Sequence, residues 1–166
     1  MKTKMLIMLA LILALVLAAS APGIARADEA VVPFKAYYTG SPVGIFDPSC
    51  NLPYGCIHQT FEFDGNATHL GLSHFSGIGN TYPFPLPLTQ NGDMVFTAAN
   101  GDQLFGYYIG GGTFTSPTSV EFGGDFWITG GTGRFEGVTG DGVYWGTAST
   151  ATPTWGKLYF DGLLYK

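Results

Sequence analysis

The sequence predicts an all-β protein, and three observations lead to this class. The 166 residues contain 25 Gly, 13 Phe, 9 Tyr and 3 Trp, while only 11% of the chain is charged. Ala and Leu, which favour helices, are concentrated near the N-terminus and become sparse afterwards. After Ala30 the sequence has no sustained 3.6-residue period, whereas period-2 alternation interrupted by Gly, Pro, Asn and Asp recurs at hairpin spacing.

The first segment has the pattern of a secretory signal peptide. Lys2 and Lys4 precede an apolar run over 5–19, and Ala25-Arg26-Ala27 supplies the small-x-small cleavage pattern. An uncleaved membrane anchor is disfavoured, because spanning a bilayer takes roughly 20 apolar residues. We therefore expect a signal peptide over 1–27, cleaved after Ala27, and a secreted product that is periplasmic or extracellular.

The expected mature chain, 28–166, is a single acidic domain. Cleavage removes three of the 7 Lys and Arg residues and none of the 12 acidic residues, which changes the net charge from −5 to −8. Nucleic acid and anionic membrane surfaces both attract clustered basic side chains, which this chain lacks. We expect neither a nucleic-acid partner nor stable membrane insertion after cleavage.

Alternation and turn residues divide the mature chain into eight strands. The clearest is the last, where Leu158, Phe160 and Leu164 share an apolar face and the charged residues occupy the other. Asn100-Gly101 predicts a tight hairpin with a type I′ turn, and the proline-rich segments at 82–87 and 116–117 predict loops. The predicted strands lie near 31–39, 57–64, 67–78, 93–99, 102–110, 118–129, 133–148 and 154–165.

Eight antiparallel strands without a covering helix favour an antiparallel eight-stranded closed barrel, since closure removes the sheet edges. Strand glycines such as Gly106, Gly142 and Gly146 suit the bends that closure needs. A two-sheet sandwich remains an alternative. An outer-membrane barrel is disfavoured, because the last strand has a polar face and no long outward apolar band is present.

Both cysteines lie in one loop of the exported part. Cys50 and Cys56 are an even pair in an oxidising context, so we expect a disulfide between them. A metal interpretation would add His58, but two Cys and one His leave a tetrahedral site incomplete. The sequence therefore predicts no metal site and no cofactor.

One run of residues has a family resemblance. Asp125-Phe126-Trp127-Ile128-Thr129-Gly130-Gly131-Thr132-Gly133-Arg134-Phe135-Glu136-Gly137-Val138-Thr139-Gly140 resembles a segment of allene oxide cyclases and, more loosely, of plant dirigent proteins, and the run 158–165 is similar to their terminal strand. The resemblance implies an eight-stranded barrel with an apolar cavity, and a homo-oligomer, often a trimer. It also implies pocket catalysis with a carboxylate near the first strands. The first strand here, 31–38, has no carboxylate, so that assignment is not carried over.

Two carboxylates, Glu62 and Glu136, are weak catalytic candidates. Glu62 and Asp64 share one face of a strand whose other face carries Phe61 and Phe63, so the simplest register places the rings inside and the acids in water. Glu136 would be well placed to polarise a ligand only if it pointed inward. The candidate residues of a ligand pocket are the apolar rings of the strands, namely Phe61, Phe63, Phe105, Tyr107, Phe135 and Phe160.

These features lead to a functional hypothesis with two alternatives. The first is an exported barrel that binds a small apolar or aromatic molecule in its lumen without a catalytic set. The alternatives are a cyclase or isomerase acting on a fatty-acid-derived or phenolic intermediate by confinement in a pocket, and a purely structural secreted scaffold. A lumen lined by Phe and Tyr with an inward Glu62 or Glu136 would favour catalysis, and a lumen filled by side chains would exclude both binding and catalysis.

Overall fold

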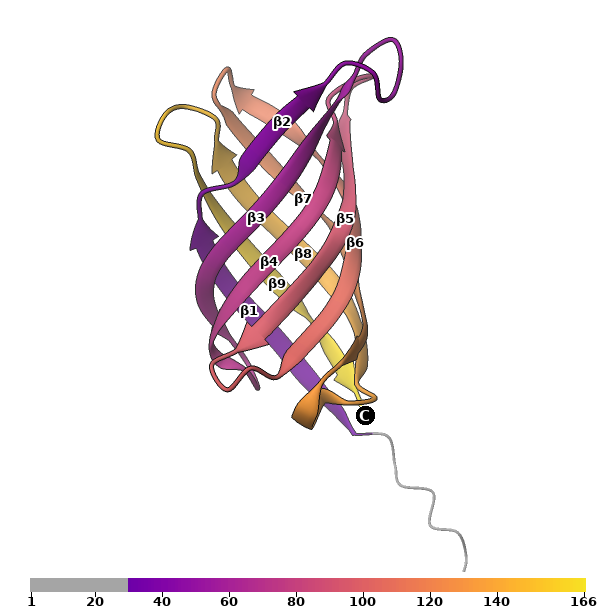
Figure 1. Cartoon of the computed structure of the whole chain (residues 1–166), viewed down its shortest axis with the longest axis vertical. Helices are drawn as coiled ribbons and strands as arrows, with labels where there is room; N and C mark the ends of the chain where they lie inside the picture. The colour runs from indigo at the N-terminus through magenta and orange to yellow at the C-terminus, as the bar shows by residue number, and fades with distance from the viewer. Residues whose placement is uncertain (1–29) are drawn as a thin grey trace, which may run out of the picture.

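The computed structural model describes residues 30–166, in which nine strands form one antiparallel sheet (Figure 1). The expected signal peptide over 1–27 and its cleavage site lie outside the described residues. The strands are β1 (Val31–Gly40), β2 (Val43–Asp47), β3 (Cys56–Ala67), β4 (Gly71–Tyr82), β5 (Leu88–Ala98), β6 (Gln103–Ser116), β7 (Ser119–Gly131), β8 (Thr139–Ser149) and β9 (Trp155–Tyr165). Within this part of the chain no helix is long and apolar enough to cross a membrane.

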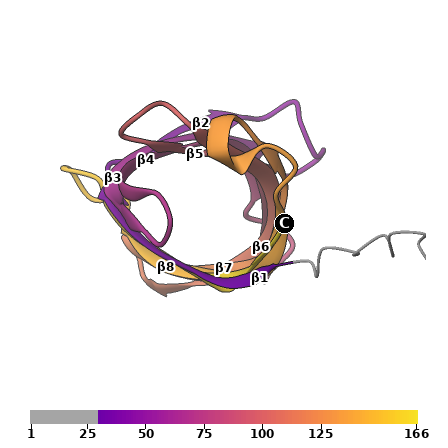
Figure 2. The same ribbon diagram turned by 90° about the horizontal axis from the view of Figure 1, so that it is seen from below.

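The sheet closes because β1 pairs with both β9 and β3. Its last residues pair with the second half of β3, from Ala36 opposite Ala67 to Gly40 opposite Phe63. The first half of β3 pairs instead with β2, so β1 and β2 together occupy one position in the wall. The barrel thus has eight strand positions, which confirms the predicted antiparallel eight-stranded closed barrel (Figure 2).

The interruption between β1 and β2 was not predicted. Pro42 lies between them and has no backbone N–H to donate to a ladder. The hydroxyl of the neighbouring Ser41 donates to the carbonyl of Thr154 at 2.9 Å, which ties this break to the loop before β9. β2 lacks a clear alternation of apolar and polar residues, because neighbouring apolar residues such as Ile45 and Phe46 are both exposed. Alternation therefore does not reveal this strand.

Several predicted strand boundaries were wrong. The strand predicted at 93–99 begins at Leu88, and the strand predicted at 102–110 continues to Ser116. The strand predicted at 67–78 begins at Gly71, because His69 and Gly71 take positive φ values of 68° and 70° in a turn. The strand predicted at 133–148 begins at Thr139, and a 3-10 turn, η1 (Gly133–Phe135), precedes it. Positive φ at Gly133 and Gly137 ends any extended conformation there.

The hairpin at Asn100-Gly101 is present, but its turn is not type I′. Only Gly101 has positive φ, at 88°, whereas type I′ needs two such residues. The N–H of Gly101 donates to the carbonyl of Ala98 and the N–H of Ala98 donates to that of Asp102, both at 2.9 Å. The hairpin therefore has a three-residue loop that ends in a left-handed glycine.

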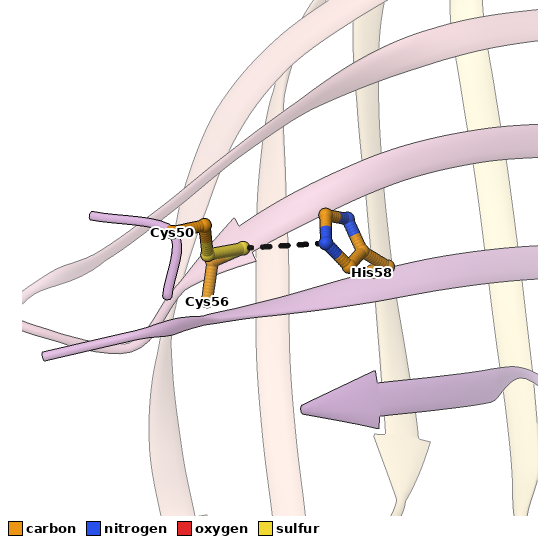
Figure 3. Close-up of side chains that lie close together, drawn as sticks. All are labelled: Cys50, Cys56 and His58. Carbon is orange, nitrogen blue, oxygen red and sulfur yellow. Dashed lines mark hydrogen bonds between the residues drawn. A yellow bond between two sulfur atoms is a disulfide. The ribbon is translucent and has the colours of Figure 1, made fainter. Parts of the chain in front are cut away.

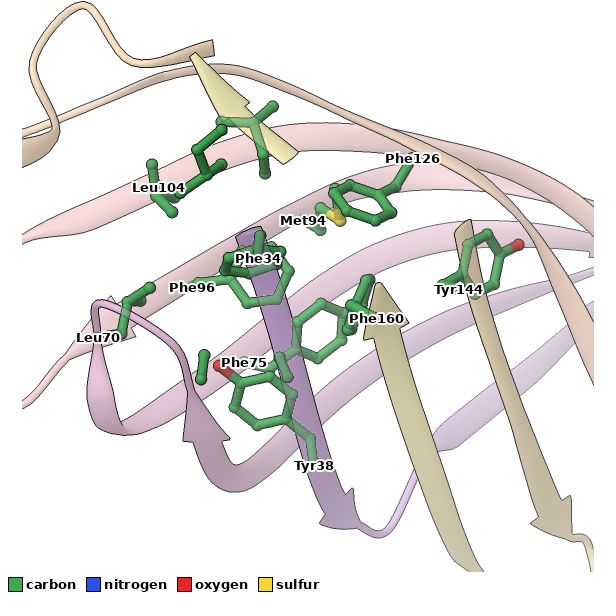
Figure 4. Close-up of a cluster of buried hydrophobic side chains, with 14 of the residues drawn as sticks. Phe34, Tyr38, Leu70, Phe75, Met94, Phe96, Leu104, Phe126, Tyr144 and Phe160 are labelled. Atoms are coloured by element: carbon green, nitrogen blue, oxygen red, sulfur yellow. The ribbon is translucent and has the colours of Figure 1, made fainter. Parts of the chain in front are cut away.

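Aromatic rings fill the middle of the barrel (Figure 4). Phe160 lies at the centre, with ring centroids 5.0 Å from Phe96 and 5.3 Å from Phe126 in edge-to-face contacts. Phe135 and Val138 are buried at the end of the barrel where the two termini of the described chain pair. We call this the closed end, and burial of so many apolar rings is the main stabilising contribution to the fold.

Inward glycines make room for these rings. Tyr108 on β6 lies beside Gly92 on β5, which lies beside Gly79 on β4. A Cβ at either glycine would collide with the Tyr108 hydroxyl, so the ring crosses the wall over positions without side chains. Tyr144 repeats the arrangement across Gly124 and Gly110. Many strand glycines thus serve ring packing as well as curvature.

Candidate functional site

The lumen is open at the end opposite the closed end. We call it the mouth; there the chain makes the loops 48–55, 83–87, 117–118 and 150–154 (Figure 1). A pocket in the mouth half is lined by six phenylalanines, two tyrosines and a few smaller or polar residues. The rings are those of Phe61, Phe63, Phe75, Phe114, Phe122, Phe160, Tyr108 and Tyr144.

The pocket is small. Its cavity volume is about 100 Å³. Pockets for drug-sized molecules measure about 300–1,000 Å³, whereas an engineered apolar cavity of about 150 Å³ stays dry and binds benzene. The volume therefore suits a molecule the size of a single ring.

The polar groups of the pocket are neutral, and four of them form two hydrogen-bonded pairs. The Thr81 hydroxyl donates to the Gln59 side-chain carbonyl at 2.8 Å. The Gln90 amide donates to the Tyr144 hydroxyl, also at 2.8 Å, and burial raises the pKa of Tyr144 to about 12. Among the described residues that line the pocket, none carries a charged side chain.

Tyr108 is the exception to this pairing. Its side chain is buried, with 6% of the residue exposed, and its hydroxyl has no hydrogen-bond partner within residues 30–166. Burial raises the pKa of Tyr108, so the hydroxyl keeps its proton at neutral pH. A buried hydroxyl without a partner costs about 1–3 kcal/mol. Tyr108 therefore brings one unpartnered, buried donor to the wall of the pocket.

Three of the predicted pocket residues line this pocket, namely Phe61, Phe63 and Phe160. Phe135 is buried at the closed end instead, as the last residue of η1 in the turn that joins β7 to β8. The structure thus divides the predicted set between the two ends of the lumen.

Phe105 and Tyr107 do not lie in the lumen, which corrects their placement. They are 38% and 39% exposed on the outer wall, and the Tyr107 ring stacks on Trp127 with centroids 5.0 Å apart. Both faces of this part of β6 are apolar, so alternation alone could not decide between them. The inward face carries Leu104 and Tyr108.

Neither carboxylate candidate reaches the pocket. Glu62 and Glu136 are exposed, Glu62 on the outer face of β3 and Glu136 in the turn after η1. Glu62 has a partner that the sequence did not indicate, since His74 on β4 places its ring between two carboxylates. Its Nε2 lies 2.6 Å from Glu62 and its Nδ1 2.8 Å from Asp64, and hydrogen bonds to Asp64 and then Glu62 raise the pKa of His74.

The predicted disulfide between Cys50 and Cys56 is present at the mouth. His58 lies beside it, with Nε2 3.9 Å from the Cys56 Sγ (Figure 3). Asp47 precedes the loop, and hydrogen bonds from the Ser49 hydroxyl and N–H lower the pKa of Asp47 to about 2. The loop is therefore held by a covalent bond and by an anionic side chain at its start.

Comparisons with known proteins find similarity among solved structures. No family model matches the chain, and no curated protein matches it. The solved structure of a pterocarpan synthase dirigent protein is similar, with 17% sequence identity, a TM-score of 0.48, and coverage of 88% of this chain and 94% of that chain.

Proposed function

We propose that the protein binds a small, neutral, apolar or aromatic molecule in the mouth pocket. The observation that carries the proposal is the contrast within one lumen, which is packed with rings at its middle and open where Phe61, Phe63 and Phe122 line it. Transfer of an apolar molecule from water to such a surface is favourable by roughly 25 cal/mol per Å² of buried area. The size of the pocket restricts the ligand to about one ring.

The Tyr108 hydroxyl supports a more specific ligand. It is a buried donor without a partner in the described chain, and no charged group lines the pocket to attract an ion. A ligand with a carbonyl or ether oxygen would accept this hydrogen bond and remove the cost of the unpaired group. We therefore infer an aromatic molecule with one hydrogen-bond acceptor.

Binding without catalysis is favoured over the cyclase alternative. Catalysis by confinement would gain from a carboxylate in the pocket, and both candidates, Glu62 and Glu136, lie outside it. The polar groups present, Gln59, Gln90 and the two tyrosines, are suited to orient a ligand through neutral hydrogen bonds.

A matched pair of ligands tests the proposal. Acetophenone and ethylbenzene have similar size, but only acetophenone carries an acceptor. We expect both to bind by calorimetry, with acetophenone tighter by about 5- to 10-fold for one net hydrogen bond. Tyr108→Phe should remove this preference while ethylbenzene still binds.

The control is Tyr107→Phe, which removes a hydroxyl from the outer wall of the same strand and should leave both affinities unchanged. If neither compound binds, and organic extracts of the purified protein contain no co-purified apolar molecule by mass spectrometry, the lumen is not a binding site. If the Tyr108→Phe variant still preferred acetophenone as strongly as the wild type does, another group would orient the ligand.

A further inference from the structure

A second site lies at the mouth, outside the pocket. Asp47 ends β2, Cys50 lies in the loop that follows, and Cys56 and His58 begin β3. The sulfur atoms of the two cysteines and a ring nitrogen of His58 all lie within 4.8 Å of one another (Figure 3). The sequence alone counted three metal-binding side chains here, and the pairing of β2 with β3 adds Asp47 as a fourth.

The two contacts of His58 Nε2 are close in length to the distances between neighbouring zinc ligands. His58 Nε2 lies 3.9 Å from Cys56 Sγ and 3.2 Å from Asp47 Oδ2. Zinc bonds of about 2.3 Å to sulfur and about 2.1 Å to nitrogen or oxygen, at tetrahedral angles, place neighbouring ligand atoms roughly 3.4–3.6 Å apart. The two contacts of His58 thus lie within a few tenths of an ångström of this spacing. The two sulfur atoms, bonded to each other in the oxidised chain, must separate to roughly 3.8 Å after reduction, and the Asp47 carboxylate must approach them.

Neighbouring groups orient both of these side chains. Asn80 on β4 accepts a hydrogen bond from His58 Nδ1 at 2.6 Å, which leaves Nε2 directed at the cysteines. Metal-binding histidines commonly have such a partner on their second nitrogen. Asp47 Oδ1 accepts from the N–H and hydroxyl of Ser49 at 2.8 and 2.6 Å, so that Oδ2 remains directed at His58.

We propose that reduction of the Cys50–Cys56 disulfide converts this cluster into a Zn²⁺ site with Asp47, Cys50, Cys56 and His58 as ligands. A dithiol reductant supplies two electrons and two protons, the S–S bond breaks, two thiols form, and the reductant becomes a disulfide. Zn²⁺ then displaces the two thiol protons to solvent and forms two bonds to sulfur. Two cysteines, one histidine and one carboxylate complete a tetrahedral site.

The disulfide and the metal would hold the same loop in two redox states. Each connects residue 50 to the start of β3, beside the opening of the pocket. The loop would therefore stay attached to the wall when the disulfide is reduced, provided that Zn²⁺ is available. This proposal does not depend on what the pocket binds.

Cobalt provides a spectroscopic test. The chain is reduced with a phosphine, which becomes a phosphine oxide by taking oxygen from water, and is then titrated with Co²⁺ without oxygen. We expect one equivalent to bind with a thiolate-to-cobalt charge-transfer band and the strong visible bands of a tetrahedral complex, and Zn²⁺ to remove both. The oxidised chain should show neither band.

Variants separate this site from adventitious binding. His58→Ala and Asp47→Asn should weaken Zn²⁺ binding by at least about 10-fold, and Asn80→Ala, which removes only the orienting partner, by about 10- to 100-fold. His74→Ala is the matched control, since this histidine also contacts carboxylates on the wall but pairs with Asp64, eight residues along β3 from Cys56. It should leave binding unchanged.

Three results would overturn the proposal: equal Co²⁺ binding by the oxidised chain, no charge-transfer band in the reduced chain, or unchanged affinity in His58→Ala. The circular dichroism spectrum of each reduced variant establishes that the barrel is intact. A reduced variant with a native spectrum and no metal binding therefore reports on the site and not on folding.

Discussion

Tyr108 and Tyr144 show how similar residues can have different roles in one pocket. Each ring crosses the wall over two inward glycines, yet only Tyr144 has a hydrogen-bond partner, Gln90. The sequence placed Tyr107 inside and not Tyr108, because both faces of β6 are apolar and the local pattern has no contrast. At this scale the sequence predicted the kind of side chain in the pocket but not every position.

The two tyrosines should respond oppositely to loss of the hydroxyl. Tyr108→Phe removes an unpartnered buried group, so we expect the free energy of unfolding to stay unchanged or rise by about 1 kcal/mol. Tyr144→Phe leaves the Gln90 amide without its acceptor and should lower it by about 1–2 kcal/mol. Urea unfolding of both variants measures the difference, and equal losses would mean that Tyr108 has a partner.

His74 should make stability depend on pH. Hydrogen bonds to Asp64 and Glu62 raise the pKa of His74 in the folded state above its unfolded value of about 6.5. The stabilisation is then fully present below the unfolded pKa and is lost as the pH rises through the folded pKa. The difference in the free energy of unfolding between the wild type and His74→Gln should therefore favour the wild type more at about pH 5.5 than at about pH 8.5.

The size of this effect is modest, because His74 and both carboxylates are largely exposed to solvent. NMR titration of the His74 ring gives the folded pKa directly, and Glu62→Gln should lower that pKa. If the stability difference were greater at the higher pH, the assignment of these hydrogen bonds would be wrong.

At the scale of elements, the β5–β6 hairpin and the β7–β8 connection support each other at the closed end. The Thr132 hydroxyl accepts the N–H of Gln103 at 2.9 Å, and Asp102 accepts the N–H of Arg134 at 3.4 Å. A Cβ on Gly133 would collide with the Asp102 carboxylate. The glycine-rich run that carried the family resemblance therefore has a structural role in joining two turns.

Two glycines of this run should differ in their tolerance of alanine. Gly133 and Gly137 both have positive φ, so each substitution costs roughly 1–2 kcal/mol in backbone strain. At Gly137 a Cβ would meet nothing within 4 Å, whereas at Gly133 it would displace Asp102. Gly133→Ala should thus lower the melting temperature more than Gly137→Ala does. Because Gly133 and Asp102 are in contact, the double variant Gly133→Ala/Asp102→Ala should lose less stability than the sum of the two single losses. Additive losses would contradict the contact.

At the scale of the whole molecule, the outer wall carries exposed apolar side chains. Phe105, Tyr107 and Ile109 follow one another along the outer face of β6, and Ile109 is 54% exposed. Exposed apolar patches commonly mark contacts between proteins. This surface is consistent with the homo-oligomer that the family resemblance implies.

We expect light scattering after gel filtration to give a mass of more than one chain. Ile109→Lys would place a charge on this outer face and should shift the mass towards the monomer. Leu72→Lys, at an apolar and more exposed position on β4, should not. A monomeric wild type would contradict the expectation.

The strands of the barrel all lie within the expected mature chain. Ala30 and Lys166 pair through two backbone hydrogen bonds, so closure at β1 and β9 uses only residues after the expected cleavage site. A chain of residues 28–166 should therefore unfold cooperatively with the same β-rich circular dichroism spectrum as the product purified after export. Intact-mass analysis of that product should begin at Asp28, and a mass that retains 1–27 would contradict cleavage.

The sequence by itself determined the all-β class, the barrel of eight strand positions, the disulfide and the inward position of Phe61, Phe63 and Phe160. These properties follow from local alternation, turn residues and cysteine spacing, all of which depend on residues that are close together in the sequence. Tertiary structure alone decided which face of β6 lines the lumen, that the pocket is open only at the mouth, and that Asp47, His58 and Asn80 converge beside the cysteines. The physical reason is that register and closure bring together distant segments, and no local pattern specifies which side chains then face each other.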